Sequence, residues 1–291
     1  MGRDLVSNDP RAAEMLAAAS QALGWPLDRI MLDGPMEELT RTACCQPALY
    51  VHGLMLLEGL RARVPELTVT AAAGLSLGEF TAHAAVGTFA VNDGLKVVAR
   101  RGELMDEACR AAKGAMVAII GGEESAIREL AAACDIDVAN LNAPGQIVLS
   151  GSEAGVDMAV ARAKEFGAKI AKKLPVAGAY HSRLMQPAQD KLADALAALP
   201  MQAPPLPVWS NFAATAVTEP AAIREVLLRQ VTGSVRWAES MAAIVAGGAS
   251  LFVELGPDKA LAGMMKRIAP DVEVLSAGTS AELDAIAGRI A

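Results

Sequence analysis

The segment Gly74-Leu75-Ser76-Leu77-Gly78-Glu79-Phe80 follows an apolar run, Leu67 to Ala73, and leads into a helix-forming stretch. A strand that runs into Gly-x-Ser-x-Gly and then into a helix is typical of a nucleophile elbow, a sharp turn that lifts a serine hydroxyl above the end of a sheet. Gly74 and Gly78 lack a Cβ, so backbone can approach closely around the strained serine. The pattern therefore predicts an α/β sheet with Ser76 as its nucleophile.

The helix that begins after the serine should direct its first N–H groups at an oxygen bound there. The backbone N–H of Leu77 is the expected oxyanion donor. A second interpretation stays open, because Ser76-x-x-Glu79 also fits a capping box, in which the serine only caps the helix. The motif by itself gives the two interpretations similar weight, so other parts of the chain must decide.

Composition limits the classes of protein and partner. The chain has 291 residues, of which 53% are hydrophobic and only 3% aromatic. This suits an α/β layer fold, either as one large domain or as one with a smaller subdomain inserted. A net charge of −7 without any Lys/Arg-rich run argues against nucleic acid. No apolar run reaches the ~18 residues of a membrane helix, and the start at Met1 has no signal-peptide core. We expect a cytoplasmic protein with no nucleic-acid or membrane partner.

The cysteines do not indicate a metal or disulfide site. The four are Cys44, Cys45, Cys109 and Cys134, without Cys-x-x-Cys spacing or a His-rich neighbourhood. They are interpreted as buried small apolar residues in a reducing compartment. No metal is expected.

The order of predicted elements changes at Gly114. From there the pattern predicts strand, helix, strand, strand, helix and strand, the ferredoxin-like split unit, with Asn142 to Gly145 as the hairpin turn. Before and after this unit, helices and strands alternate. The sequence thus predicts an α/β fold: a hydrolase-like parallel-sheet domain of residues 1–113 and 181–291 with an inserted ferredoxin-like (βαββαβ) subdomain at residues 114–180.

Two details of the larger domain are specific enough to test. A strand is expected from Leu67 to Gly74, and the nearly continuous apolar run Leu251 to Leu255 is typical of a buried parallel strand. A long helical region from Gly34-Pro35 to about Arg63 is expected to be interrupted near Gln46-Pro47.

A serine nucleophile needs a base, and histidine is the usual one. His83 would lie roughly 10 Å along the helix from Ser76, so a packing role is expected for it. His52 falls within a helix and is interpreted as a satisfied helix histidine. His181 follows the last strand of the inserted unit, where the chain returns to the larger domain, and functional groups tend to converge on such junction loops. We therefore expect His181 to be the base.

The third member of a triad has no good candidate. An α/β-hydrolase places an acid between the nucleophile and the histidine in chain order. Asp135, Asp137 and Asp157 fall inside the inserted unit and look poorly placed for that role. The remaining arrangement is a Ser-His dyad oriented by a backbone carbonyl.

Five motifs occur in order along the chain: Gly74-Leu-Ser-Leu-Gly-Glu79, Arg100-Arg-Gly-Glu-Leu-Met105, Asn142-Ala-Pro-Gly-Gln146 with Ser150-Gly151, Tyr180-His-Ser-Arg-Leu-Met185 and Glu254-Leu-Gly-Pro257. Together they resemble the malonyl-CoA:acyl carrier protein transacylases. The similarity runs from about Met1 to the C-terminus.

The resemblance implies a ping-pong acyl transfer with no bound cofactor. Ser76 would attack the malonyl thioester with His181 as base, CoA would leave, and the phosphopantetheine thiol of holo acyl carrier protein would take the malonyl group. Arg101 would hold the free malonyl carboxylate, although an arginine on a helix is more often a solvated charge. Tyr180 resembles the bulky aromatic of malonyl-selective members, which would crowd an α-methyl group. A main-chain carbonyl near Arg236 would hold the histidine.

The chain departs from the family pattern in two places. Leu75 stands where the family usually has histidine. Family members also begin with a strand and a Gly-Gln-Gly-Ser-Gln turn ahead of the segment that matches Met1 to Leu5, and this sequence shows neither. A missing oxyanion donor costs on the order of 10²–10³ in rate, and a missing inner strand leaves unpaired backbone. The expectation is that the given sequence starts at an internal methionine.

The leading hypothesis is therefore a monomeric malonyltransferase of fatty acid or polyketide synthesis, with malonyl-CoA and holo acyl carrier protein as partners. Two alternatives stay open: an acyl ester or thioester hydrolase, and a catalytically impaired homologue that only binds carrier protein. An acidic carrier protein would need a local basic patch. The candidates are Lys172, Lys173, Arg229, Lys266 and Arg267.

Overall fold

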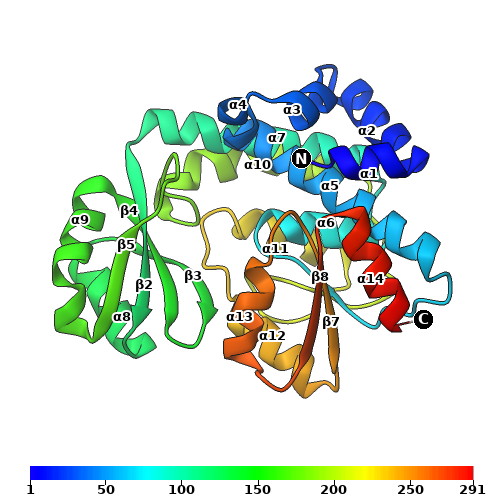
Figure 1. Ribbon diagram of the computed structural model, residues 1–291. Helices are drawn as coiled ribbons and strands as arrows, with labels where there is room; N and C mark the ends of the chain where they lie inside the picture. The colour runs from blue at the N-terminus through cyan, green and yellow to red at the C-terminus, as the bar shows by residue number, and fades with distance from the viewer. Residues whose placement is uncertain (291) are drawn as a thin grey trace.

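Two pairs of parallel strands and one antiparallel sheet form the framework of the structure, a computed structural model that describes residues 1–290. Strand β1 (Ala72–Ala73) pairs with β6 (Val208–Trp209), and β7 (Leu251–Leu255) pairs with β8 (Glu273–Ala277). Figure 1 shows the antiparallel sheet apart from these pairs, at the left of the view.

The antiparallel sheet has the strand order β3-β4-β2-β5. Its strands are β2 (Gly114–Gly121), β3 (Asp137–Ala143), β4 (Gln146–Ser152) and β5 (Ala168–Lys173), and its helices are α8 (Glu124–Ala133), α9 (Glu153–Arg162) and the 3-10 turn η1 (Ala163–Phe166). Chain order and strand order are those of a ferredoxin-like unit. A separate core fills the space between sheet and helices, around Val117, Leu149 and Ile127. The predicted fold class is confirmed; the division of the chain at residues 114 and 180 stays a prediction.

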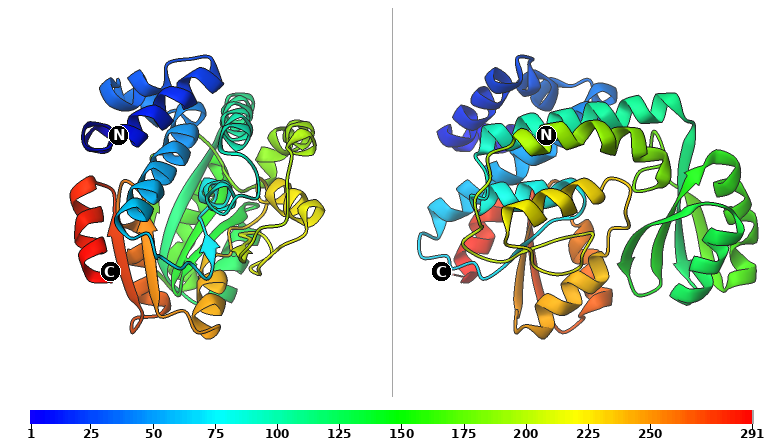
Figure 2. Two further views of the ribbon diagram at one scale, coloured as in Figure 1. Left: turned by 90° about the vertical axis from the view of Figure 1, so that its right-hand side faces the viewer. Right: turned by 180° about the vertical axis from the view of Figure 1, so that it is seen from behind.

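Helices make up most of the remaining chain. They are α1 (Arg3–Asn8), α2 (Pro10–Leu23), α3 (Leu27–Asp33), α4 (Met36–Thr40), α5 (Thr42–Arg63), α6 (Leu77–Ala85), α7 (Val91–Ala111), the 3-10 turn η2 (Arg183–Met185), α10 (Gln186–Ala198), α11 (Pro220–Arg229), α12 (Trp237–Ala246), α13 (Ala260–Ile268) and α14 (Ser280–Ile290). Helices α7 and α10 pack side by side and extend toward the antiparallel sheet (Figure 2).

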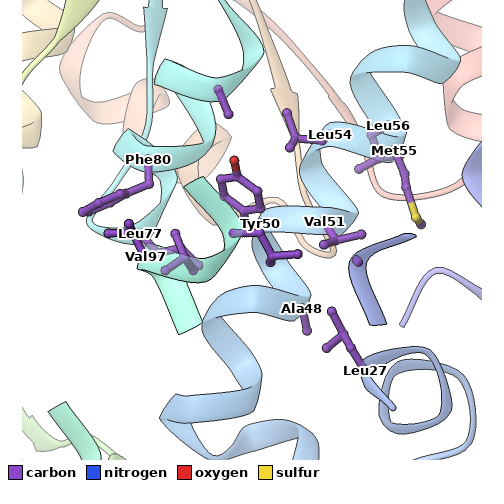
Figure 3. Packing of buried hydrophobic residues seen from close by; sticks show 14 of the residues in the cluster. Leu27, Ala48, Tyr50, Val51, Leu54, Met55, Leu56, Leu77, Phe80 and Val97 are labelled. Carbon is purple, nitrogen blue, oxygen red and sulfur yellow. The ribbon is translucent and has the colours of Figure 1, made fainter. Parts of the chain in front are cut away.

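Helix α5 lies at the centre of the main core. It contacts α2, α3, α6, α7 and α14, so apolar side chains point from it in all directions, as expected of a helix buried on every side. Figure 3 shows Tyr50 of α5 beside Leu77 and Phe80 of α6, while Val51 and Leu54 lie on the other side of Tyr50. This packing fixes α6, whose N-terminus carries the candidate nucleophile.

Two sequence-based expectations about the parallel strands are wrong. The expected strand from Leu67 to Gly74 is reduced to the two residues of β1, and the expected buried strand β7 is largely half-exposed, with 41% of Leu251 accessible. The reason is pairing: β1 pairs only with β6 and β7 only with β8 within residues 1–290. A sheet of only two strands is narrow, so the side chains on its two faces are covered only in part.

The helical region before the elbow is interrupted at a different residue from the one expected. The break between α4 and α5 is at Arg41, and Pro47 lies inside α5. Pro47 lies past the first turn of α5, where it removes one backbone hydrogen bond without ending the helix. Within residues 1–290, no helix has both the length and the apolar character to cross a bilayer.

Candidate active site

Ser76 occupies a strained turn between β1 and α6. Its φ of 53° and ψ of −110° lie outside the regions favoured by L-residues. A Cβ on Gly74 would lie 2.0 Å from the backbone of Gly78, so only glycine fits at the first position of the motif. The expected elbow geometry is present, and the strain is of the kind that is stored at functional sites.

His181 is the histidine that meets this serine. Its Nε2 lies 2.8 Å from Oγ of Ser76, and its Nδ1 lies 2.8 Å from the main-chain oxygen of Gln230. A carbonyl can only accept, so Nδ1 carries the proton and Nε2 is free to accept the serine proton. Burial, and next the positive charge of Arg101, lower the pKa of His181 to about 4. The imidazole is therefore neutral near pH 7, as a base must be.

The carbonyl that orients His181 belongs to Gln230, so the expectation of a carbonyl near Arg236 is wrong. Arg236 pairs with Glu239 and donates to the carbonyl of Ala213 at 3.0 Å. Gln230 caps the C-terminus of α11, where the last carbonyls of a helix lack intrahelical partners. One of these free acceptors holds the histidine.

The other two histidines lie in the core. Nδ1 of His83 is 3.1 Å from Oγ1 of Thr88, which agrees with the expected packing role. His52 is also buried, but its Nδ1 has no hydrogen-bond partner within residues 1–290. The expectation of a satisfied helix histidine is therefore wrong for that nitrogen.

The capping-box interpretation of Ser76 is wrong as well. The serine side chain makes no capping hydrogen bond to α6. The carboxylate of Glu79 does not reach back to the cap either; its Oε2 accepts from the backbone N–H of Asn211 at 2.9 Å and from Nε2 of Gln230 at 2.6 Å. Both side chains of the motif are engaged elsewhere.

Arg101 lies beside the serine hydroxyl and not in solvent. It is 1% exposed, and its Nη2 donates to Oγ of Ser76 and to Oε1 of Gln230, both at 3.1 Å, while Nη1 donates to Oε1 of Gln46 at 2.6 Å. Burial lowers its pKa to about 10, which still leaves it protonated at neutral pH. No ion pair of the described residues includes Arg101. A buried cation whose partners are neutral oxygens is unusual and is suited to receive an anion.

Leu77 and Tyr180 complete the predicted set. Leu77 is the first residue of α6, and its N–H finds no acceptor in the described part of the chain. Tyr180 is half-buried next to His181, and its hydroxyl bonds Oγ1 of Thr42 at the start of α5. Burial is the main cause of a raised pKa for Tyr180, so the phenol stays neutral. The structure thus brings Ser76, His181 and Arg101 into contact, with Leu77 and Tyr180 adjacent to them in the chain.

Sequence reasoning missed three amides of the site: Gln46, Asn211 and Gln230. Asn211 hydrogen-bonds the backbone of the elbow at two residues. Its Oδ1 accepts from the N–H of Ser76, and its Nδ2 donates to the carbonyl of Gly74 at 2.8 Å. These amides come from three distant segments, and no local pattern marks them. Leu75, which replaces the usual histidine, packs in an apolar cluster with Trp237.

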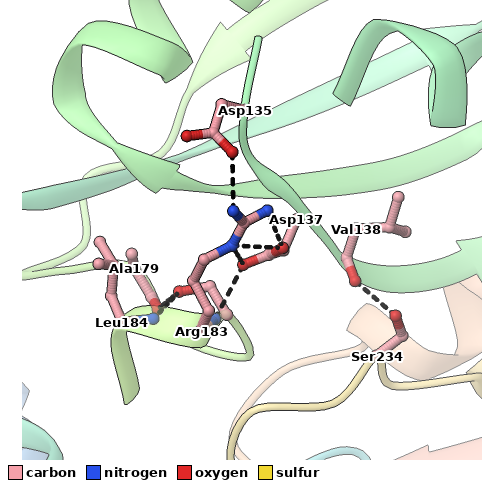
Figure 4. Close-up of polar contacts among 8 residues, drawn as sticks. Asp135, Asp137, Val138, Ala179, Arg183, Leu184 and Ser234 are labelled. Carbon is pink, nitrogen blue, oxygen red and sulfur yellow. Dashed lines mark hydrogen bonds and ion pairs between the residues drawn. The ribbon is translucent and has the colours of Figure 1, made fainter. Parts of the chain in front are cut away.

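The loop that carries His181 is fixed to the antiparallel sheet by Arg183. The guanidinium donates to Asp137 of β3 at 2.8 Å and to Asp135 at 2.7 Å, and the backbone N–H of Arg183 also bonds Asp137 (Figure 4). Both aspartates therefore orient the loop, which agrees with their exclusion as a triad acid. No group of three or more His, Cys, Asp or Glu side chains in residues 1–290 is arranged to hold a metal.

Comparison with known proteins places most of the chain in one family. Residues 1–281 match the family model described as acyl transferase domain. A malonyl CoA-acyl carrier protein transacylase of Bacillus subtilis is 39% identical over 275 residues, which cover 92% of this chain and 86% of that protein. The chain belongs to the malonyl-CoA:acyl carrier protein transacylase family.

Solved structures of transacylases have the same fold. The malonyl CoA-acyl carrier protein transacylase from Coxiella burnetii superposes with a TM-score of 0.96 at 35% identity, covering 100% of this chain and 93% of that one. A malonyl-transacylase solved in complex with its type II polyketide acyl carrier protein gives a TM-score of 0.94 at 33% identity, with coverage of 99% and 94%. The predicted family and the predicted α/β fold are both confirmed.

Proposed function

We propose that this chain transfers malonyl from malonyl-CoA to the phosphopantetheine thiol of holo acyl carrier protein through a malonyl-Ser76 ester. Membership of the transacylase family supports acyl transfer to a carrier protein. The observation that supports malonyl in particular is Arg101, a buried guanidinium without a carboxylate partner, 3.1 Å from the Ser76 hydroxyl oxygen. A guanidinium there selects an acyl group that carries its own carboxylate.

The first half-reaction loads the serine. Oγ of Ser76 attacks the thioester carbon while Nε2 of His181 takes the hydroxyl proton. The carbonyl oxygen becomes an oxyanion, which the free N–H of Leu77 stabilises. When the tetrahedral intermediate collapses, the C–S bond breaks and the proton on His181 passes to the CoA sulfur, leaving malonyl-Ser76 and free CoA.

The second half-reaction reverses these steps with a different thiol. His181 takes the proton of the phosphopantetheine thiol, the sulfur attacks the ester carbon, and the C–O bond to Ser76 breaks. The proton returns to Oγ. Throughout, the carbonyl of Gln230 keeps Nδ1 of His181 protonated, so Nε2 is the only ring nitrogen that exchanges protons.

Intact-protein mass spectrometry tests this proposal directly. The purified chain is mixed briefly with malonyl-CoA, and holo carrier protein is added afterwards. We expect a malonyl adduct on the wild-type chain that moves to the carrier, and no adduct on Ser76→Ala. An adduct that disappears as free malonate without carrier protein would instead show a hydrolase. A folded chain that binds carrier protein and forms no adduct would be an impaired homologue.

The expected monomeric state and cytoplasmic setting remain part of this proposal.

Of the expected basic docking residues, Lys173 pairs with Asp157 and Arg229 pairs with Glu225, while Lys172 forms no ion pair within residues 1–290. Size-exclusion chromatography with light scattering tests the oligomeric state. Titration with carrier protein at two salt concentrations tests whether docking is electrostatic.

A further inference from the structure

Glu79 is a buried carboxyl group that is linked to the candidate dyad through Gln230. It lies in the first turn of α6, is fully buried, and makes no hydrogen bond to the hydroxyl of Ser76 or the imidazole of His181 within residues 1–290. Its Oε2 accepts two hydrogen bonds, and its Oε1 has no partner within residues 1–290. Moving a carboxyl group out of water costs free energy. The two hydrogen bonds that Glu79 accepts are contacts that an apolar side chain could not make.

The first of these bonds leads to the nucleophile. Glu79 holds the backbone N–H of Asn211 at 2.9 Å. The side chain of Asn211 in turn accepts from the N–H of Ser76 and donates to the carbonyl of Gly74, two residues earlier. The side-chain amide of Asn211 thus hydrogen-bonds the strained backbone at both Gly74 and Ser76. The position of Asn211 depends in turn on its hydrogen bond to Glu79.

The second bond leads to both members of the dyad. Nε2 of Gln230 uses one proton for Oε2 of Glu79 at 2.6 Å and the other for the carbonyl of Ser76 at 3.0 Å. The main-chain oxygen of the same residue accepts from Nδ1 of His181. Gln230 therefore fixes the serine through its side chain and the histidine through its backbone, and Glu79 fixes Gln230.

We propose that Glu79 is a positioning residue, which aligns Ser76 with His181 by anchoring Asn211 and Gln230 through a single carboxyl oxygen. This inference rests on the proposed roles of Ser76 and His181. It explains how a serine at φ 53° and a histidine at φ 56°, both in a region that L-residues rarely adopt, are held in hydrogen-bond contact. Misplacing such a pair by about 1 Å reduces the rate on the order of 10²-fold.

The two bonds need an acceptor but not a charge. Burial raises the pKa of Glu79 to about 7, and a proton would be placed on Oε1, which has no partner, without disturbing the bonds to Oε2. Glutamine offers the same acceptor in its amide oxygen. Glu79→Gln should therefore keep the alignment, whereas Glu79→Ala removes the acceptor for both bonds.

The test measures how fast Ser76 reacts with two reagents. A fluorophosphonate probe needs only the serine and its base, and malonyl-CoA adds the proposed substrate. We expect Glu79→Ala to slow both reactions roughly 10- to 100-fold. The malonyl-CoA concentration that gives the half-maximal rate should change little. The rates of Glu79→Gln should stay within about threefold of the wild-type rates. Asn211→Ala should slow both reactions too, and adding it to Glu79→Ala should cost little more, because the two residues act in one chain of contacts.

Thr88→Val is the matched control for a purely structural effect. It breaks a buried contact with His83 at the other end of the same helix. We expect it to lower the melting temperature while Ser76 reacts at the wild-type rate. A folded Glu79→Ala that reacts with fluorophosphonate at the wild-type rate would overturn the proposal. If Glu79→Ala does not fold, the Glu79→Gln and Asn211→Ala variants test the proposal instead. Slow reaction of Ser76 in Glu79→Gln, or reaction at the wild-type rate in Asn211→Ala, would overturn the proposal.

The two reagents keep this inference separate from the proposed function. A wild-type chain that reacts with fluorophosphonate but takes no malonyl group would overturn malonyl transfer. The fluorophosphonate rates of the variants would still decide the role of Glu79.

Discussion

Nη2 of Arg101 donates a hydrogen bond to the hydroxyl oxygen of Ser76 over 3.1 Å. In a malonyl thioester one methylene separates the carboxylate carbon from the carbon under attack. In the proposed reaction, a guanidinium in contact with the attacking oxygen would therefore lie within reach of that carboxylate. The same contact places a positive charge near His181, which contributes to its lowered pKa.

Replacing Arg101 should lower the activity with malonyl-CoA more than the activity with acetyl-CoA. Arg101→Ala is expected to lower kcat/KM for malonyl-CoA roughly 10- to 100-fold, because a hydrogen bond to a charged group contributes about 1.5–3 kcal/mol, and to affect acetyl-CoA much less. Arg100→Ala is the matched control, since that neighbour is half-exposed and pairs with Glu103. Initial rates with both thioesters measure the effect. Equal losses for the two acyl groups would show that Arg101 does not bind the carboxylate.

The sequence predicted the parts of the site that depend on short segments. Gly-x-Ser-x-Gly determines its own turn, because only glycine fits at residue 74, and His181 could be found by elimination among three histidines. Gln230 and Asn211 could not be found in this way. Their roles depend on where the end of α11 and the loop after β6 come to lie against α6, and no local pattern encodes such a contact.

The fold shows the same limit. Residues 114–180 follow local patterns, and their predicted order of strands and helices along the chain is found. Leu251 to Leu255 is apolar enough for a strand with neighbours on both edges, yet β7 has only β8 within residues 1–290. Hydrophobicity predicts that a strand forms, but its exposure depends on pairing with segments far away in the sequence.

The ring of Tyr180 should limit the size of the acyl group. Its hydroxyl is tied to Thr42, so the ring next to His181 has one preferred position. Tyr180→Ala is expected to raise the kcat/KM ratio of methylmalonyl-CoA to malonyl-CoA roughly tenfold, about the value of one methylene in a pocket. Thr42→Val keeps the shape of that side chain and should produce a smaller rise in the ratio. Competition between the two thioesters measures it, and an unchanged ratio in Tyr180→Ala would contradict a role in selectivity.

The pH profile of serine acylation should report an unusually acidic base. His181 has a pKa of about 4, so it stays unprotonated well below the usual value of 6.5. Because only the neutral imidazole accepts the serine proton, the rate should be flat from about pH 8 to pH 5 and fall below it. Stopped-flow acylation by malonyl-CoA measures the profile. A rate profile with its midpoint between pH 6 and pH 7 would mean that burial and the charge of Arg101 do not control the pKa of His181.

Acid should destabilise the fold through the buried histidines His52 and His83. Burial lowers the pKa of each from 6.5 to about 4. Between these values the unfolded chain binds protons that the folded chain does not, so the free energy of unfolding falls as the pH drops from 6.5 to 4. Glu79 acts in the opposite direction, since its pKa is raised from 4.5 to about 7 and its contribution grows as the pH falls through that range. Urea unfolding at pH 7.5, 6 and 5 should show a net loss with acidification, because three buried histidines, His181 included, oppose one carboxyl group. In His83→Leu the loss should be smaller, and an identical pH dependence in that variant would contradict the assignment.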